Sequence, residues 1–386
     1  MIARALMLVA LCGIATSTVY LLLVGVAVLR FRRKRIPAVP AELPPVTLLK
    51  PVHGIEPQLH HSIESFFCQD YPRFEIIFGA RSVDDPALEV VRDLMRKYPQ
   101  VSVKLVASGE PPWPNAKCWS LVQMAEQAAY DYLVVSDSDV EVTPNYLREL
   151  IPPLLQPNVG CVTTVYRGKA VDGLWAQLEA LGMSVEMTSG VLIADMLEGM
   201  RFALGPTMAV RRDALERIGG FGRFAEYCSD DFLLGKLVAD AGYQVVLSPH
   251  VIDHIILHES LRQSIAHQAR WMKSTRYSRP KGHLGMALTF SLPYGVLGMA
   301  AGAASSRPSL AALVFAATFL NRVVLSIVAG WGAIRDRRSL VFSWLYPLRD
   351  LMGFGFWLAS YVSDRILWRG ERYRLQVGGK MVKINL

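Results

Sequence analysis

Two aspartates with one residue between them, Asp137 and Asp139, follow an apolar run over 133–135 that has the character of a buried strand. Open α/β sheets bind ligands beyond the carboxyl ends of their strands. Oxygen ligands suit Mg²⁺ or Mn²⁺, and substrate phosphates often complete the coordination of such ions. The pair therefore predicts a metal-bound diphosphate. The same spacing is short and common, however, so one aspartate could simply cap the next helix while the other is solvated.

More polar clusters stand at the expected ends of strands or starts of helices. They are Asp84-Asp85, Asn115 with Lys117, and Asp230-Asp231, and a fifth, His267-x-x-Arg270-Trp271, lies on a later basic segment. A sugar diphosphate needs cations on its leaving phosphates, a polar pocket for its base, and a carboxylate that takes the proton from the attacking hydroxyl. Together the clusters predict nucleotide-sugar chemistry.

Each cluster also has an ordinary structural explanation. Asp84-Asp85-Pro86 is a good helix start, and Asp230 and Asp231 could cap a helix. Residues 115–117 could form a plain loop, and Trp271 could be an interface anchor. The histidines, among them His53, His258 and His267, are expected to pack or hydrogen-bond, because none has the spacing of a zinc site.

The segments between the clusters alternate strand and helix patterns. Strands are expected at 46–49, 75–78, 101–106 and 133–135, and helices at 59–67, 87–98 and 119–129. This order predicts a parallel, doubly wound sheet. Further along, the pattern indicates a helix at 147–155, a strand at 160–166, a loop feeding a strand at 202–211, a helix at 230–241 and a strand at 244–247.

Long apolar runs predict an integral membrane protein. Residues 6–29 can cross a hydrocarbon core, and the basic residues of 30–35 follow them, which favours an uncleaved anchor with its carboxyl end in the cytoplasm over a signal peptide. Runs at 286–304, 310–333 and 340–362 are further spanning candidates. The side of the membrane on which the basic tail lies stays open, because the number of spans and the charge of the tail point in opposite directions.

Charged residues interrupt several apolar runs. The segment 174–197 holds Glu179, Glu186 and Asp195, so we expect a helix at the membrane face or along an acceptor groove and not a span. Arg349 and Asp350 interrupt the last run and could pair locally. Residues 258–276 are basic, amphipathic and Trp-bearing, which is typical of a helix on a membrane surface.

The composition agrees with a membrane enzyme. The chain has 386 residues, of which 52% are hydrophobic, and a formal net charge of +8 that flanks the apolar runs. This placement favours a membrane surface and not nucleic acid as the partner of the positive charge. The five cysteines are scattered and predict neither a disulfide framework nor a metal site.

From about 48 to 379 the chain resembles the ceramide glucosyltransferases and the related bacterial hopanoid-associated glycosyltransferases. The matching stretches are Lys50-Pro51-Val52-His53-Gly54-Ile55-Glu56-Pro57, Gln69-Asp70-Tyr71-Pro72-Arg73-Phe74-Glu75, Asp84-Asp85-Pro86-Ala87, Asn115-Ala116-Lys117, Ser136-Asp137-Ser138-Asp139, Asp230-Asp231-Phe232, Arg270-Trp271, and Tyr373-Arg374-Leu375 with Gly378-Gly379. Each stretch is weak alone, and their order and spacing make the signal strong. The resemblance implies an α/β GT-A domain with a mixed sheet, one N-terminal and about three C-terminal transmembrane helices.

The resemblance also implies roles for individual residues. The base and ribose would lie near Pro51, His53, Glu56 and Asp84 or Asp85, the diphosphate near Asn115 and Lys117, and a Mn²⁺ or Mg²⁺ ion on Asp137 and Asp139, with Asp137 also binding the nucleotide sugar. Asp231 would be the general base with Asp230 beside it, and Arg270 and Trp271 would close over diphosphate and acceptor, with His267 as a further catalytic residue on the same segment. His267 replaces the usual Gln or Arg, and Asp139 replaces a Gly of the animal enzymes, so the acceptor stays open.

The sequence therefore predicts an inverting membrane glycosyltransferase that moves a hexose or N-acetylhexosamine from a UDP-sugar to a lipid hydroxyl. UDP-glucose to ceramide and UDP-N-acetylglucosamine to a hopanoid are both compatible, and a processive polysaccharide synthase or a non-catalytic membrane protein are the alternatives. The expected parts are an anchor at 1–35, a catalytic domain at 46–257 in the cytoplasm of a bacterium, an interface helix at 258–282, a transmembrane region at 283–366 and a basic tail at 367–386.

Overall fold

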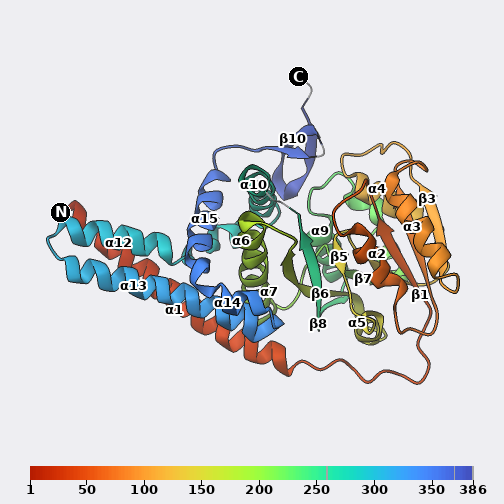
Figure 1. The fold of residues 1–386 in the computed structure, drawn as a ribbon, viewed down its shortest axis with the longest axis horizontal. Helices are drawn as coiled ribbons and strands as arrows, with labels where there is room; N and C mark the ends of the chain where they lie inside the picture. The colour runs from red at the N-terminus through yellow and green to blue at the C-terminus, as the bar shows by residue number, and fades with distance from the viewer. Residues whose placement is uncertain (258–259, 369, 385–386) are drawn as a thin grey trace. The chain divides into compact units, whose positions relative to one another are not determined.

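The computed structural model describes residues 1–257, 260–368 and 370–384, and its chain divides into two compact units (Figure 1). The sheet unit comprises Lys34–Val171, Glu198–Leu257 and Gly379–Leu386, and the helical unit comprises Met1–Arg33, Asp172–Leu197 and His258–Gly378. Residues 172–197 therefore belong to the helical unit, although the domain expected from the sequence, 46–257, encloses them. His258 and the expected start of the interface helix lie outside the described residues.

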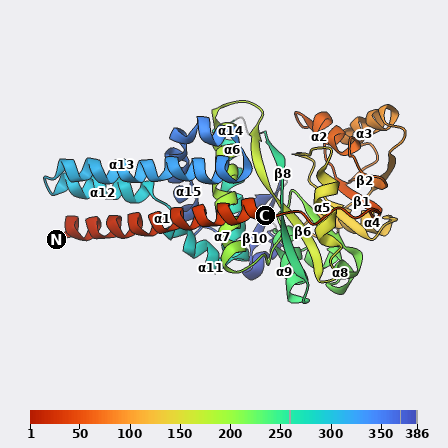
Figure 2. The ribbon, with the colours of Figure 1, turned by 90° about the horizontal axis from the view of Figure 1, so that it is seen from below.

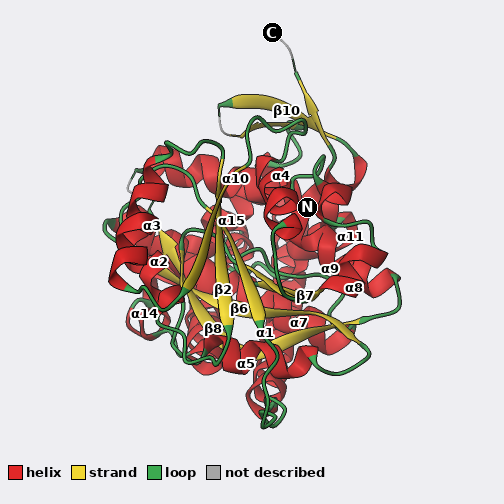
Figure 3. Ribbon diagram, turned by 90° about the vertical axis from the view of Figure 1, so that its right-hand side faces the viewer, coloured by secondary structure: helices red, strands yellow, loops and turns green. Residues whose placement is uncertain are grey.

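The sheet unit is built on an eight-stranded sheet with the order β3-β2-β1-β4-β7-β6-β8-β5 (Figure 3). The strands are β1 Val46–Pro51, β2 Phe74–Ala80, β3 Ser102–Ala107, β4 Tyr132–Val135, β5 Val140–Glu141, β6 Val159–Ala170, β7 Met208–Arg211 and β8 Gln244–Ile256. Strands β1, β2 and β4 are almost entirely buried, as the apolar runs predict.

The sheet is mixed, as the resemblance implies, whereas the alternation of strands and helices taken alone predicted a parallel sheet. Strands β3, β2, β1 and β4 are parallel, but β7 runs antiparallel to both β4 and β6, and β5 runs antiparallel to β8. The chain reaches β7 after the excursion 172–197 and not through a crossover helix of a βαβ unit, so the rule that makes such strands parallel does not apply there.

The helices of the sheet unit agree with the sequence pattern, with one shift. They are α2 Leu59–Phe67, α3 Pro86–Lys97, α4 Ala116–Glu126, α5 Tyr146–Leu154, α8 Arg212–Arg217 and α9 Asp230–Asp240, and a short strand, β11 Met381–Lys383, belongs to the same unit. Helix α4 begins three residues earlier than expected because the Asn115 side chain accepts a hydrogen bond from the Cys118 N–H and caps it. The shift places Lys117 in the first turn.

Three parallel strands end at one edge of the sheet. The register aligns Leu49 of β1 with Val135 of β4, and Pro51 with Gly79 of β2. The loops after β1, β2 and β4 therefore leave the sheet side by side. These loops carry the predicted residues around 53, 84 and 137, which is the edge where open α/β sheets bind ligands.

The helical unit contains α1, α6, α7, α10 to α15 and a β-hairpin (Figure 2). Their bounds are α1 Ile2–Arg33, α6 Leu174–Gly182, α7 Thr188–Leu197, α10 Leu261–Ser278, α11 Pro280–Gly285, α12 Leu292–Ala304, α13 Pro308–Leu325, α14 Arg337–Val341, α15 Tyr346–Ala359, β9 Arg365–Trp368 and β10 Glu371–Leu375. A π-helical turn, Met183–Met187, joins α6 to α7, and a second, Ser326–Ala333, extends α13.

Three helices of the described chain are long and apolar enough to cross a membrane: Ile2–Arg33, Leu174–Leu197 and Pro308–Ala333. A fourth candidate is the pair Pro280–Leu288 and Leu292–Ala304, which is bent by 42°. The run at 174–197, which the sequence placed at the membrane face, thus meets the length and composition of a span. The run at 340–362 does not form one helix.

A 3₁₀ turn, Ser343–Leu345, separates α14 from α15 in that last run, and Pro347 follows in the first turn of α15. Proline removes a backbone donor and favours a helix start over a helix interior. Helix α15 has 14 residues, and a span needs about 20. The apolar run therefore supplies a packing helix shorter than a span.

The buried charges of the helical unit are paired between helices. Arg322 of α13 lies 3.2 Å from Asp350 of α15, and the other Asp350 oxygen accepts the backbone N–H groups of Ser291 and Leu292 at 3.0 and 2.8 Å. Arg349 instead lies 2.9 Å from Glu186. Arg349 and Asp350 thus do not pair with each other, because neighbouring residues point to different sides of a helix.

The Arg322–Asp350 pair generates a stability prediction. Asp350→Asn should lower the free energy of unfolding by about 3–5 kcal/mol, because it leaves the Arg322 charge, 1% exposed, without its counter-charge. Thermal unfolding of the purified protein in detergent measures the change. Asp172→Asn, at an exposed position of the same unit, is the matched control. An equal unfolding temperature for both variants would contradict the prediction.

Candidate active site

Lys117 stands at the centre of the charged groups of the sheet unit. Its ammonium nitrogen lies 2.7 Å from Asp137 Oδ1 and 3.3 Å from Asp230 Oδ2. Burial alone would lower the pKa of Lys117, but the two carboxylates raise the pKa above its ordinary value. Lys117 is therefore charged at neutral pH, and it joins residues from the end of β4 and the start of α9.

Asn115 holds the Lys117 segment in place. Besides capping α4, its Nδ2 donates to the Tyr227 carbonyl at 3.0 Å, and its backbone N–H donates to the Ala225 carbonyl at 2.9 Å. Residues 225–227 lead into α9, so these bonds bring the first turns of α4 and α9 together. The predicted contact of Asn115 with substrate stays a prediction, and the structure gives this residue a positioning role.

Asp139 lies near two residues that the sequence reasoning missed, His254 and Lys50. Its Oδ2 lies 3.3 Å from His254 Nε2, and Lys50 donates to the Asp137 carbonyl at 2.6 Å while its ammonium stands 3.6 Å from the centre of the Phe66 ring. Burial would raise the pKa of Asp139, but His254 and Lys50 lower it to about 2. Burial also lowers the pKa of Lys50 to about 7. Asp139 is thus ionised throughout the physiological range.

His254 was missed because the strand predicted from the sequence was too short. The sequence pattern placed the last strand at 244–247, whereas β8 continues to Ile256 and carries His254 to the site. Lys50 is the first residue of a stretch that the resemblance already identified, at the end of the buried strand β1. A lysine at the end of an apolar strand is a signal that the sequence could have offered. Such a lysine is expected to be buried, and a buried charge needs a partner; Lys50 is indeed 1% exposed.

Asp231 is the carboxylate that faces Asp137 across Gly205. Its Oδ2 accepts the Gly205 N–H at 2.8 Å. A Cβ atom at position 205 would lie 3.2 Å from that oxygen and 3.6 Å from Asp137 Oδ2, so both carboxylates border the space beside this glycine. Ser229 occupies the N-cap position of α9, and Asp231 bonds to a distant loop. The alternative that Asp231 is only a helix cap therefore does not describe its contacts.

Burial raises the pKa of Asp231 to about 6, and the neighbouring Asp230 adds to this shift. The hydrogen bonds from the backbone N–H groups of Phe232 and Gly205 act in the opposite direction. Asp139 and Asp231 thus titrate far apart, the first as a permanent anion and the second near the pH at which a general base works well.

The predicted base-binding residues form a second group at the same sheet edge. Asp85 accepts the Gly54 N–H at 2.8 Å and caps α3 through the Ala87 N–H at 3.0 Å, and its other oxygen lies 3.2 Å from His53 Nδ1. Asp85 therefore ties together the loops that follow β1 and β2. Asp84 is exposed beside it, Pro51 ends β1, and Glu56 lies in the loop before α2.

The residues predicted to close over the diphosphate belong to α10 of the helical unit. His267 Nδ1 lies 2.7 Å from Glu179 Oε1 and its ring is 4.7 Å from the Trp271 ring. The Arg270 guanidinium stands 5.5 Å from the centre of the Trp368 ring. The catalytic roles of His267, Arg270 and Trp271 stay predictions, because all of these contacts lie within the helical unit.

The donor set fits a divalent cation in part. No group of three or more His, Cys, Asp or Glu side chains that could hold an ion occurs within the chain segments the structure describes. Asp137 and Asp139 offer two carboxylates, and the buried Asp139 Oδ1 has no hydrogen-bond partner among these residues. Mg²⁺ is often bound by one or two carboxylates with substrate phosphates and waters as the remaining ligands. The pair fits such an open site.

The comparison with solved structures confirms the predicted GT-A fold. A mannosyltransferase from Pyrobaculum calidifontis, solved in complex with GDP-Man and Mn²⁺, superposes with a TM-score of 0.61, covering 92% of this chain and 98% of that one. The two sequences are 19% identical, so the likeness concerns the fold.

Sequence comparison gives the family. Ceramide glucosyltransferase 1 of Caenorhabditis elegans is 24% identical over 352 residues, covering 88% of this chain and 73% of the relative. The ceramide glucosyltransferase of Komagataella phaffii is 36% identical over 127 residues, which are 32% of this chain and 25% of that enzyme. The family model described as glycosyl transferase family 21 matches residues 5–381. Because that match runs through both units, the chain is a glycosyltransferase and belongs to glycosyl transferase family 21.

Proposed function

We propose that this chain is an inverting membrane glycosyltransferase that moves a hexose, most simply glucose, from a UDP-sugar to the hydroxyl of a lipid such as ceramide. The observation that carries this proposal is the pair of carboxylates beside Gly205: Asp231, with a pKa of about 6, faces Asp137, which Lys117 neutralises. An acceptor hydroxyl needs a base such as Asp231, and a diphosphate needs a cation such as Lys117, and transfer requires the two groups to lie next to each other.

The contacts of the four aspartates assign the base. Asp137 and Asp230 are paired with Lys117, and Asp139 with His254. Asp231 accepts backbone N–H groups, and burial raises its pKa to about 6, which suits proton transfer. Burial raises the pKa of Asp137 as well, but Asp137 is paired with Lys117. Asp231 would remove the proton of the lipid hydroxyl as its oxygen attacks the anomeric carbon.

The presence of one carboxylate without an ion-pair partner in the described chain, Asp231, favours inversion of the anomeric configuration. By analogy with glycosidases, retention needs a second carboxylate as nucleophile, and the neighbours of Asp231 are already held by cations. The Lys117 ammonium would stabilise the charge that develops on the departing UDP, with Arg270 as a second proposed donor. A divalent cation held by Asp137 and Asp139 would add Lewis-acid stabilisation of the same diphosphate.

The relatives and the helical unit support the donor and acceptor classes. The curated relatives are ceramide glucosyltransferases, and the described chain has three or four apolar segments that could cross a membrane. A soluble acceptor would need none of these segments. The basic residues in the last turn of α1, Arg30, Arg32 and Arg33, favour a cytoplasmic position for the sheet unit that follows them. The proposed location is a bacterial inner membrane. A hopanoid acceptor with UDP-N-acetylglucosamine stays a second option within the same chemistry.

One assay separates these possibilities. The purified protein, in lipid nanodiscs, is supplied with UDP-glucose, UDP-N-acetylglucosamine or GDP-mannose together with ceramide or a hopanoid, and the organic phase is analysed by mass spectrometry. We expect one sugar on one extracted lipid with a UDP-sugar. A growing polymer would identify a processive synthase, and no product with any pair would contradict the proposal.

The role of Asp231 gives the first catalytic prediction. Asp231→Asn should lower kcat by about 10²–10⁴-fold, the usual contribution of a general base, while the Kd for UDP changes little. Turnover and calorimetric binding are measured on the same preparation. Asp240→Asn, which removes an exposed carboxylate from the other end of α9, should be as active as the parent protein. Transfer by the Asp231 variant at the parental rate would remove Asp231 as the base.

The pH dependence follows from the same pKa. A base must be ionised to accept a proton, so kcat/KM should fall about tenfold per pH unit below the Asp231 pKa of about 6 and be level above it. The Kd for UDP, followed over the same pH range, controls for loss of binding. A kcat/KM profile that is flat down to pH 4.5 would contradict a base with this pKa.

The metal proposal has its own readout. Asp139→Asn should raise the Mn²⁺ concentration needed for half-maximal UDP binding by about tenfold or more, because it removes one of two proposed carboxylate ligands. Titration of Mn²⁺ in the presence of UDP, monitored by calorimetry, measures this shift. Asp131→Asn, an exposed residue before β4, is the matched control. Identical titrations for the two variants would exclude Asp139 as a ligand.

A further inference from the structure

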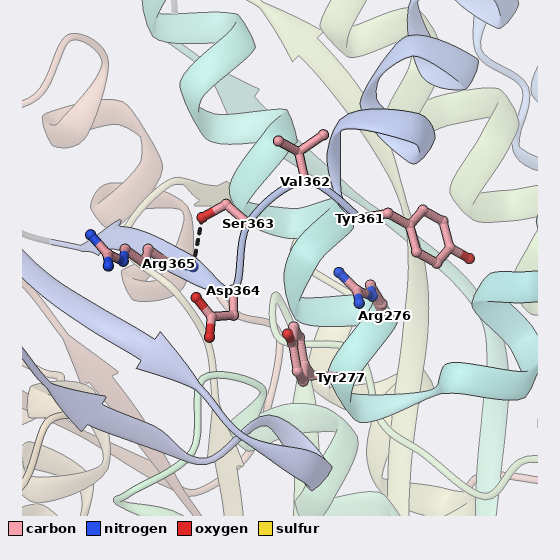
Figure 4. Close-up of a pocket in the computed structure, with 7 residues that line it drawn as sticks. All are labelled: Arg276, Tyr277, Tyr361, Val362, Ser363, Asp364 and Arg365. Atoms are coloured by element: carbon pink, nitrogen blue, oxygen red, sulfur yellow. Dashed lines mark hydrogen bonds between the residues drawn. The ribbon is translucent and has the colours of Figure 1, made fainter.

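A pocket of about 530 Å³ lies within the helical unit, between the end of α10 and the segment that follows α15 (Figure 4). Arg276 and Tyr277 of α10 form one side, and residues 361–365 form the other. The proposed transfer reaction uses none of these residues. The pocket is in the size range of small-ligand sites, and it is open to the surface of the helical unit.

Arg276 is the polar centre of this pocket. Its guanidinium stands 4.6 Å from the centre of the Tyr361 ring and 5.2 Å from that of the Tyr277 ring, and one N–H donates to the Ser360 carbonyl at 2.5 Å. It forms no ion pair with any carboxylate of the described chain, and a guanidinium has five N–H donors. Arg276 is therefore fixed in orientation while donors are left for an anion, and planar, bidentate recognition of phosphate is the chemistry that arginine serves best.

The charge around Arg276 also favours an anion. Helix α10 carries Arg262, Arg270, Lys273 and Arg276 and has no acidic residue. Asp364 lines the pocket, but Arg374 lies 3.3 Å from its carboxylate and offsets that charge. Figure 4 shows the Arg365 side chain pointing away from Arg276, so we assign the direct contact with the anion to Arg276 alone.

Two residues that line the pocket, Tyr361 and Val362, expose an aromatic and an apolar side chain beside its polar groups. Val362 is 86% exposed and Tyr361 is 43% exposed. A free phosphate ion would gain nothing from these two side chains, whereas the glycerol and acyl carbons of a lipid would bury them. Tyrosine is also enriched where a protein surface meets the headgroup region of a bilayer.

We propose that this pocket binds the phosphate of a membrane phospholipid, with Arg276 as its ligand and Val362 packed against the lipid's glycerol and acyl carbons. The bound lipid would hold α10 and the segment after α15 together at the membrane surface. Because the site needs neither donor nor acceptor, its occupancy can be measured without turnover, and failure of the proposed transfer reaction would leave it untouched.

The test compares three soluble probes on the full-length protein in a neutral detergent. Dihexanoyl phosphatidylglycerol should raise the unfolding temperature in a saturable manner, and the effect should weaken with added salt. Dihexanoylglycerol, which lacks the phosphate, and inorganic phosphate, which lacks the apolar part, should each do so at least tenfold less effectively. Equal stabilisation by inorganic phosphate would identify a free-anion site and overturn the lipid proposal, as would equal stabilisation by dihexanoylglycerol.

Two variants locate the site. Val362→Glu places a carboxylate at the rim without loss of packing and should weaken the apparent affinity for the phospholipid probe about tenfold, whereas Val377→Glu, at a position of the same unit that is 92% exposed and outside the pocket, should not. Arg276→Gln should abolish saturation, and its unfolding temperature without lipid shows whether it folds. Parental affinity in a folded Arg276→Gln or in Val362→Glu would overturn the proposal.

Discussion

The ion pairs of Lys117 are the interaction on which the active site depends. Asp137, Asp230 and Asp231 converge from β4 and α9, and without a cation their mutual repulsion and their partial burial would favour protonation or separation. Lys117 can supply that cation because Asn115 caps α4 and ties its first turn to the segment before α9. The same ammonium that holds the apo site together is then available to the phosphates of a substrate.

The sheet and the helices fix the positions of the side chains in this charge cluster. Parallel strands β1, β2 and β4 end at the same edge of the sheet. Their register therefore places Lys50, at the end of β1, and the loops that carry Asp85 and Asp137 at that edge. Gly205 completes the arrangement, because the absence of a side chain leaves open the space that Asp137 and Asp231 border. In the helical unit, charges that a membrane would penalise are matched by partners on other helices, as Glu186 is by Arg349.

Much of this could be predicted from the sequence, wherever the signal was local. Helix α2 has the predicted bounds, β4 differs by one residue, and the strand-end aspartates were identified from spacing and resemblance. The errors concern partners distant in the chain. The reversal of β7, the pairing of Asp139 with His254 and the pairing of Asp350 with Arg322 depend on tertiary contacts that no local pattern encodes. The run 174–197 was expected at the membrane face or along an acceptor groove, and not as a span, because the sequence does not show the partners of its charges, such as His267 for Glu179.

The central claim is that one carboxylate, Asp231, acts as a base while its acidic neighbours are held by cations. The anomeric configuration of the product tests this most directly. A single displacement from a UDP-α-sugar gives a β-linked glycolipid, which two-dimensional NMR of the purified product distinguishes by its anomeric coupling. We predict the β-linked product. An α-linked product would require a second nucleophile or a different course of displacement, and would contradict the assignment of Asp231 as the base.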